Sequence, residues 1–160
     1  AQRDARPEPE LAQARLDGFA ADGFAGVRWD STWFASMSAL AEAVVALGRV
    51  DDAEVLLRRL APHSGMVIDI SCVSGCFGPM DRVLGALAET VGELDAAIAF
   101  YAAAVATCER ISSRPWLALC EERLAGALER RGDPGDVDRV ETLRTHARIV
   151  ADESGVVLGS

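Results

Sequence analysis

The sequence predicts an all-α fold made of stacked antiparallel helix hairpins. Apolar residues recur at helical spacing in seven segments of the 160-residue chain. Half of the residues are hydrophobic but only 6% are aromatic, which favours helices that pack through Ala, Leu and Val. A helix-turn-helix phrase also returns at a fixed offset along the chain. Such a period is typical of arrays in which each hairpin buries one face against its neighbour.

The repeated phrase joins two helical patterns in each copy. It reads Leu47-Gly48-Arg49-Val50-Asp51-Asp52-Ala53 and returns 44 residues later as Val91-Gly92-Glu93-Leu94-Asp95-Ala96-Ala97, with a looser third copy at 131–136. The Gly is expected to end the first helix, because only Gly adopts the left-handed conformation cheaply. The Asp is expected to cap the next helix. The small Ala would let the two helices approach closely.

Three helices are expected in the N-terminal part of the domain. Residues 1–9 are expected to form a loose lead-in, and the domain itself is expected to span 10–155. A short helix is predicted over 10–24, and Asp30 is expected to cap a second helix with a long apolar stripe. Its antiparallel partner covers 51–60. The inward positions of this pair are Trp33, Met37, Leu40, Ala41, Val44, Val55, Leu56 and Leu60.

Residues 62–78 interrupt this pattern. They contain three Gly, three Ser and a β-branched run at 67–70, so a long irregular connection or a short extended piece is expected. Pro79 would then lie in the first turn of a new helix. Further helices are predicted over about 94–111, 115–128 and 136–153, followed by a short tail at 156–160.

Composition and charge exclude several classes of function. The chain has no Lys, so it cannot contain a phosphate-binding loop of the Gly-x4-Gly-Lys-Ser/Thr type. A net charge of −9 argues against direct nucleic-acid binding. No apolar stretch is long enough to span a membrane, and the charged N-terminus lacks the apolar core of a signal peptide. A cytoplasmic location with reduced cysteines is therefore expected.

The spacing of Gly92, Ala97, Tyr101 and Ala104 resembles the tetratricopeptide repeat. A second copy at 48–60 fits with Leu at the last position, and the third copy fits more loosely. This resemblance implies a right-handed solenoid of about seven helices. In such arrays the first helices of each pair line the concave face that binds ligands.

A longer series of motifs resembles the helical-repeat region of large bacterial regulators. In those proteins a signalling ATPase module is joined to such repeats, often with a LuxR-type DNA-binding domain or an adenylate cyclase domain. The resemblance implies a non-catalytic module without a cofactor, which binds a protein, peptide or small inducer and can form homo-oligomers. The alternative is a regulatory segment of a cyclase or ATPase enzyme. The motifs are 24–30, Trp33, 40–42, 47–48, 60–62, 77–79, 84–85, 114–118 and 131–136.

The candidate binding residues lie on the predicted first helices. They are Arg82, Glu89, Trp116 and Arg123, and no catalytic residue is expected. A metal site is the weaker alternative for His63, Cys72 and Cys76, whose spacing is not that of a common zinc site.

Two further sets of residues have open interpretations. Cys108 and Cys120 lie near the facing ends of consecutive helices, where they could remain reduced core thiols or become oxidised. The paired carboxylates, such as Glu121-Glu122, are expected on polar faces or at helix starts. His146 is expected to be exposed.

Overall fold

The structure, a computed structural model, describes residues 9–70 and 75–158. Within these ranges seven α-helices and a small two-stranded sheet confirm the predicted all-α class. Short 3-10 turns at Ala61–His63 and Pro134–Asp136 complete the elements. The helices are α1 (Pro9–Ala20), α2 (Trp33–Ala46), α3 (Val50–Leu60), α4 (Met80–Val91), α5 (Leu94–Arg110), α6 (Arg114–Arg131) and α7 (Val137–Ser154).

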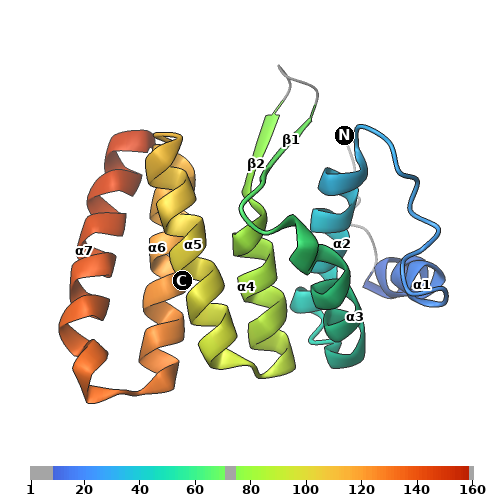
Figure 1. The fold of residues 1–160 in the computed structure, drawn as a ribbon, viewed down its shortest axis with the longest axis horizontal. Coiled ribbons are helices and arrows are strands. Elements are labelled where there is room, and N and C mark those ends of the chain that lie inside the picture. Colours follow the sequence, from blue (N-terminus) through green and yellow to red (C-terminus); the bar gives the residue numbers. More distant parts are fainter. Residues whose placement is uncertain (1–8, 71–74, 159–160) are drawn as a thin grey trace, which may run out of the picture.

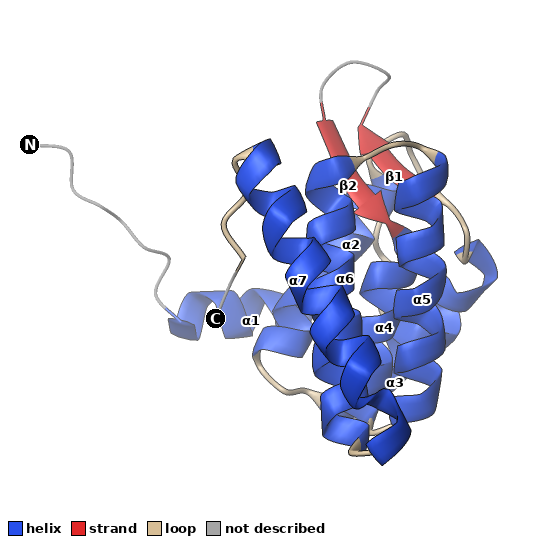
Figure 2. Cartoon of the chain, turned by 90° about the vertical axis from the view of Figure 1, so that its left-hand side faces the viewer, coloured by secondary structure: helices blue, strands red, loops and turns tan. Residues whose placement is uncertain are grey.

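Helices α2 to α7 stand side by side in a row (Figure 1). Each helix packs against the next one along the chain, and α2 also contacts α4. Helix α1 lies across the end of the row that is opposite α7 (Figures 1 and 2). This arrangement agrees with stacked hairpins, whereas the right-handed superhelical sense stays a prediction.

The helices end where the repeated glycines predict. Gly92 follows α4 with a φ of 90°, and Gly132 follows α6 with a φ of 70°, both in the left-handed region. The predicted Asp caps, however, are wrong. Arg49 and Glu93 occupy the positions before α3 and α5, and neither side chain makes a capping hydrogen bond. The acidic residues lie in the first turns, where their charge favours the helix dipole.

The residue at the start of α2 also differs from the predicted cap. Thr32, rather than Asp30, occupies the position before the helix. Asp30 Oδ1 instead accepts hydrogen bonds from the Thr32 backbone N–H at 2.9 Å and from its hydroxyl at 2.7 Å. Asp30 therefore stabilises the turn that leads into α2, three residues before the helix begins at Trp33.

The segment before α4 forms a β-hairpin. Strand β1 (Val67–Ile70) pairs antiparallel with β2 (Gly75–Pro79), and a register shift follows Ile68. The extended piece was predicted, but its pairing was not, because pairing depends on the partner strand. Buried Asp81 holds the base of the hairpin by accepting hydrogen bonds from Ser64 Oγ at 2.6 Å and Gly65 N at 2.8 Å.

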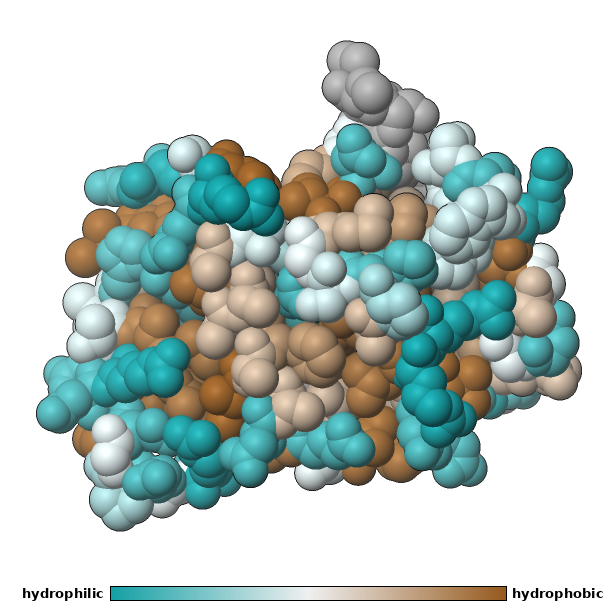
Figure 3. Space-filling model, in the orientation of Figure 1, coloured by the Kyte–Doolittle hydropathy of each residue, from teal (hydrophilic) through white to brown (hydrophobic). Residues whose placement is uncertain are grey.

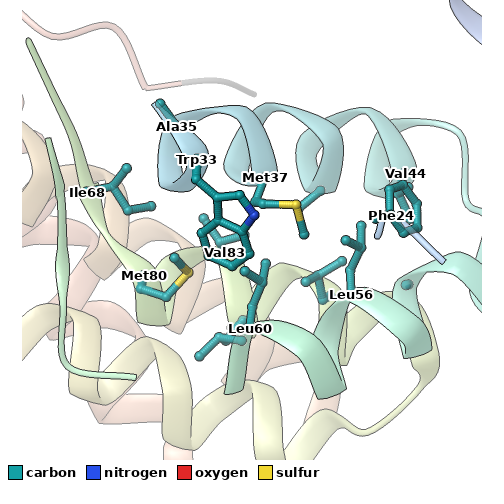
Figure 4. Packing of buried hydrophobic residues seen from close by; sticks show 14 of the residues in the cluster. Phe24, Trp33, Ala35, Met37, Val44, Leu56, Leu60, Ile68, Met80 and Val83 are labelled. Atoms are coloured by element: carbon teal, nitrogen blue, oxygen red, sulfur yellow. The ribbon is translucent and has the colours of Figure 1, made fainter. Parts of the chain in front are cut away.

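The N-terminal half of the core joins α2, α3 and α4. Trp33 and Met37 of α2 point toward Leu56 and Leu60 of α3 (Figure 4). Met80 of α4 completes this layer. The stripe predicted for α2 is buried at Trp33, Met37, Ala41 and Val44, while Leu40 is partly exposed.

The C-terminal half of the core depends on small residues. Ala97 and Ala104 of α5 are fully buried, as the repeat pattern predicts. Tyr101, between them, is also fully buried and faces Gly85 of α4. A Cβ atom on Gly85 would lie 2.5 Å from Tyr101 Cε1, so α4 and α5 approach closely at this point.

Within residues 9–70 and 75–158, no helix is both long and apolar enough to cross a bilayer. The surface is mixed: Figure 3 shows a band of apolar residues across the middle of one face, with hydrophilic groups around it.

Candidate functional site

A groove of about 410 Å³ opens on the face formed by the first helices of the pairs. Helices α2 and α4 supply most of its wall, and α5 and α6 contribute one residue each. Its floor consists of small aliphatic side chains, and its polar groups are two arginines, a glutamate and a tyrosine. The lining residues are Ala41, Glu42, Val45, Ala46, Arg82, Val83, Ala86, Tyr101 and Arg123.

The structure brings the four predicted binding residues into one neighbourhood. Arg82 and Arg123 line the groove directly. Trp116 and Glu89 lie outside the lining, but Trp116 contacts Arg82 and Glu89 contacts Tyr101. Sequence reasoning missed Glu42 and Tyr101 as groove residues. Tyr101 was recognised only as a packing residue of the repeat.

Arg82 connects three helices. Its Nη2 donates a hydrogen bond to Glu42 Oε1 of α2 at 2.7 Å. Its guanidinium carbon lies 5.1 Å from the ring centre of Trp116 on α6, a cation–π distance. Its Nε is buried and has no hydrogen-bond partner among the described residues. Any movement of Arg82 therefore changes contacts on both sides of α4.

Tyr101 supplies a hydroxyl at the edge of the groove. It donates a hydrogen bond to Glu89 Oε2 at 3.1 Å, and Glu89 also forms an ion pair with Arg130. Burial of the ring, together with the nearby charge of Glu89, raises the pKa of Tyr101 well above its usual range. The phenol therefore stays protonated and acts as a hydrogen-bond donor.

Arg123 differs from the other arginine of the groove. Its side chain is exposed, and within the described part of the chain it forms no ion pair. Its guanidinium lies close enough to lower the pKa of Tyr101 in opposition to burial. Arg123 is thus the positive group of the groove that is available to an incoming ligand.

Trp116 attaches the β-hairpin to the helical array. Its Nε1 donates a hydrogen bond to the backbone carbonyl of Cys76 at 3.2 Å. Gly78 packs on the ring so closely that a Cβ there would lie 2.7 Å from Trp116 Cδ2. Trp116 therefore fills the space between α6 and the β-hairpin.

His63 and Cys76, two of the three residues considered for a metal site, lie in different surroundings. His63 packs among aromatic rings, with its ring centre 5.0 Å from that of Phe34 and 5.5 Å from that of Trp33. Cys76 is exposed on β2, and its sulfur accepts a hydrogen bond from Gly78 N at 3.4 Å. Cys72 lies outside the described residues. Among the residues that are described, no group of three or more His, Cys, Asp or Glu is placed to hold a metal ion.

The exposed aromatic residue Trp29 belongs to the same cluster as His63. Its ring centre lies 4.3 Å from that of Trp33, although 70% of Trp29 is exposed. Trp29 lies before α2, outside the apolar stripe of that helix. Its contacts show that it covers the buried Trp33 from the solvent side.

Two further groups are buried at α6: a cysteine pair shared with α5, and the carboxylate of Glu121. Cys108 and Cys120 do approach each other, with 3.9 Å between their sulfurs, and the structure has them as free thiols. Glu121, expected on a polar face, is instead buried with a side chain only 6% exposed. Its Oε1 lies 2.7 Å from Nδ1 of the exposed His146.

Glu121 could have been found from its position in the helical pattern. It follows Leu117 by four residues and precedes Leu124 by three, so it shares their inward face. Burial raises its pKa, while the hydrogen bond and charge of His146 act in the opposite direction. Its Oε2 is buried without a partner in the described residues.

Comparison of the chain with protein-family models, curated proteins and solved structures finds no match. The groove itself indicates what the domain can bind. Its groups are suited to binding: two guanidinium groups and a phenol donor stand above an aliphatic floor.

Proposed function

We propose that this domain is a non-catalytic binding module and that the groove between α2, α4 and α6 is its ligand site. The ligand is a protein segment, peptide or small inducer that combines an anionic group with a short apolar part. One observation carries the proposal: Arg82 and Arg123 converge on a single groove with an aliphatic floor. The floor can bury the apolar part, and the guanidinium groups can pair with the anion.

The net charge of the whole chain limits how an anionic ligand can be recognised. The protein carries a net charge of −9, so an anionic ligand is not attracted at long range. Recognition must come from the local pair of arginines. Arg123 is available at once, whereas Arg82 must exchange its contact with Glu42 for one with the ligand.

This exchange offers a route for relaying the binding event. Arg82 also contacts Trp116, and Trp116 holds the β-hairpin through Cys76. A ligand that moves Arg82 would alter this chain of contacts. The resemblance to bacterial regulators suggests that the relay reaches an attached signalling ATPase with a LuxR-type DNA-binding domain or a cyclase domain.

Selection from a displayed random-peptide library, followed by calorimetric titration, tests the groove. Selected peptides should contain acidic residues beside apolar ones. Arg123→Glu should weaken their binding at least about tenfold, because it places like charges together. Arg148→Glu is the matched control on the exposed surface of α7 and should bind normally. Peptides without acidic residues, or equal effects of both variants, would contradict the proposal.

A further inference from the structure

The cysteine pair beneath Trp116 has the geometry of two thiols that can be joined. Cys108 lies in the last turns of α5, and Cys120 lies in the second turn of α6. Their sulfurs are 3.9 Å apart, within hydrogen-bonding distance for sulfur but not covalently bonded. Both side chains are fully buried beside Ala104, with Trp116 and Leu117 packed against them. Each sulfur therefore has the other as its nearest reactive partner.

The two thiols are not equivalent. The hydrogen bond between the sulfurs lowers the pKa of Cys108 and raises that of Cys120. The positive charge of Arg82 lowers both values. Cys108 is therefore the first of the pair to ionise, and the thiolate is the form that reacts with oxidants.

We infer that Cys108 and Cys120 form a reversible intramolecular disulfide when the chain is exposed to a hydroperoxide. The Cys108 thiolate attacks the peroxide oxygen, the O–O bond breaks, and water or an alcohol leaves. The resulting sulfenic acid is then attacked by the Cys120 sulfur, which releases water and forms the S–S bond. Two thiols are oxidised by two electrons, and one hydroperoxide is reduced.

Access to the pair requires local opening. Both sulfurs are closed to solvent, so the turn at 111–113, which joins α5 to α6, must open first. Ser112 in this turn has a φ of 54°, in the left-handed region that non-glycine residues rarely adopt. The reaction should therefore be slower than oxidation of the exposed Cys76. Once Cys108 is oxidised, the adjacent Cys120 resolves it before further oxidation.

The disulfide would change the contacts of Trp116. An S–S bond of about 2.05 Å requires the sulfurs to move closer by roughly 1.9 Å. Trp116 packs on this pair and on Arg82, so the movement reaches the wall of the groove. This last step rests on the proposed function, whereas formation of the disulfide does not.

The test uses the full chain with Cys72→Ser and Cys76→Ser, so that only the buried pair remains. After treatment with hydrogen peroxide, free thiols are alkylated under denaturing conditions and the protein is analysed by non-reducing peptide mapping. We expect one cross-link between the Cys108 and Cys120 peptides, a mass lower by two hydrogen atoms, and reversal by dithiothreitol. The oxidised chain should also melt roughly 4 °C or more above the reduced one.

Two variants separate the parts of the inference. With Cys120→Ala, Cys108 should proceed to sulfinic acid because no resolving thiol remains. In the chain that keeps Trp116, oxidation should change the tryptophan fluorescence, because Trp116 packs on the cysteine pair. With Trp116→Phe, this change should disappear. Two alkylated thiols after peroxide treatment, or cross-links only between chains, would overturn the disulfide. A disulfide that forms without any change in Trp116 emission would overturn the coupling to the groove alone.

Discussion

At the residue scale, the contact between Gly85 and Tyr101 shows how one missing side chain sets a helix distance. The Tyr101 ring occupies the space where a Cβ of residue 85 would lie. Gly126, in the interior of α6, has no atom within 4 Å of the corresponding position. The two helical glycines thus differ in packing although they share a low intrinsic helix propensity.

Alanine substitution at these two glycines should have opposite effects. Gly85→Ala should lower the free energy of unfolding by about 1–3 kcal/mol, because the new methyl group overlaps the buried Tyr101 ring. Gly126→Ala should raise it by about 0.5–1 kcal/mol through better helix propensity alone. Urea denaturation of both variants provides the measurement. Stabilisation of the chain by Gly85→Ala would show that α4 and α5 are farther apart than the contact between Gly85 and Tyr101 indicates.

Glu121 is the residue whose burial has a consequence for pH dependence. Its folded-state pKa is raised above the ordinary value of 4.5, mainly by loss of solvent. The folded protein therefore holds this proton at pH values where the unfolded chain releases it. The stability contributed by protonated Glu121 is complete below pH 4.5 and is lost as pH rises through the folded-state pKa.

Glu121→Gln should remove this dependence. The variant should gain stability relative to the natural chain as pH rises from about 4 to about 8, because the neutral amide has no buried charge. Thermal melting at several pH values measures the difference. Glu141→Gln, at an exposed position of α7, is the control and should give a constant difference. A gain that shrinks with rising pH would show that the pairing with His146 dominates over burial.

At the element scale, α5 is positioned by alanines on its inner face. Ala97 is fully buried at the crossing with neighbouring helices, whereas Ala99, two residues later, is exposed. The two positions have the same residue in the same helix and differ in packing. They form a matched pair for testing whether the repeat requires a methyl group at residue 97.

Ala97→Leu should lower the free energy of unfolding by about 1–3 kcal/mol, because three extra carbons have no space at the crossing. Ala99→Leu should change it by less than about 0.5 kcal/mol. Chemical denaturation with fluorescence detection would compare them. If the denaturation midpoint of Ala97→Leu were unchanged, the helices would not cross at this residue.

Helix ends were easier to predict than the Asp residues that cap helix starts. Gly92 and Gly132 stop their helices through a backbone preference that belongs to the residue itself. Capping by Asp needs a particular side-chain rotamer and a particular position, and a shift of one or two residues abolishes it. Asp30 is such a case, since it bonds to Thr32 instead of to the helix.

At the scale of the whole molecule, the row of helices resembles a one-dimensional array. Each inner helix packs on neighbours at both sides, while α1 and α7 have a helix on one side only (Figure 1). In such arrays stability is approximately a sum of repeats and the interfaces between them. The ends should therefore open at lower free energy than the centre.

Hydrogen–deuterium exchange should reveal this gradient. Amides of α4, α5 and α6 should exchange slowest, and those of α1 and α7 should exchange first. Mass spectrometry of peptic fragments, with time points from seconds to hours, gives the comparison. Uniform protection of all seven helices would instead indicate a single cooperative unit with no weaker ends.

The candidate site was predictable only in part. The position of Arg82 and Arg123 on first helices follows from hairpin order, and both line the groove. The partners of Arg82 were not predictable, since Glu42 and Trp116 lie on other helices. The β-hairpin illustrates the same limit, because its extended run was visible but the strand opposite it was not.

The sequence by itself determined the helical class, the order of the hairpins and the ends of most helices. These properties depend on apolar spacing and glycine preferences, which act over a few residues. Only the tertiary structure decided that Arg82 meets Glu42 across 40 residues and that Cys108 meets Cys120. Such contacts depend on how helices rotate and pack against one another, and this is set by the shapes of all the interacting faces together.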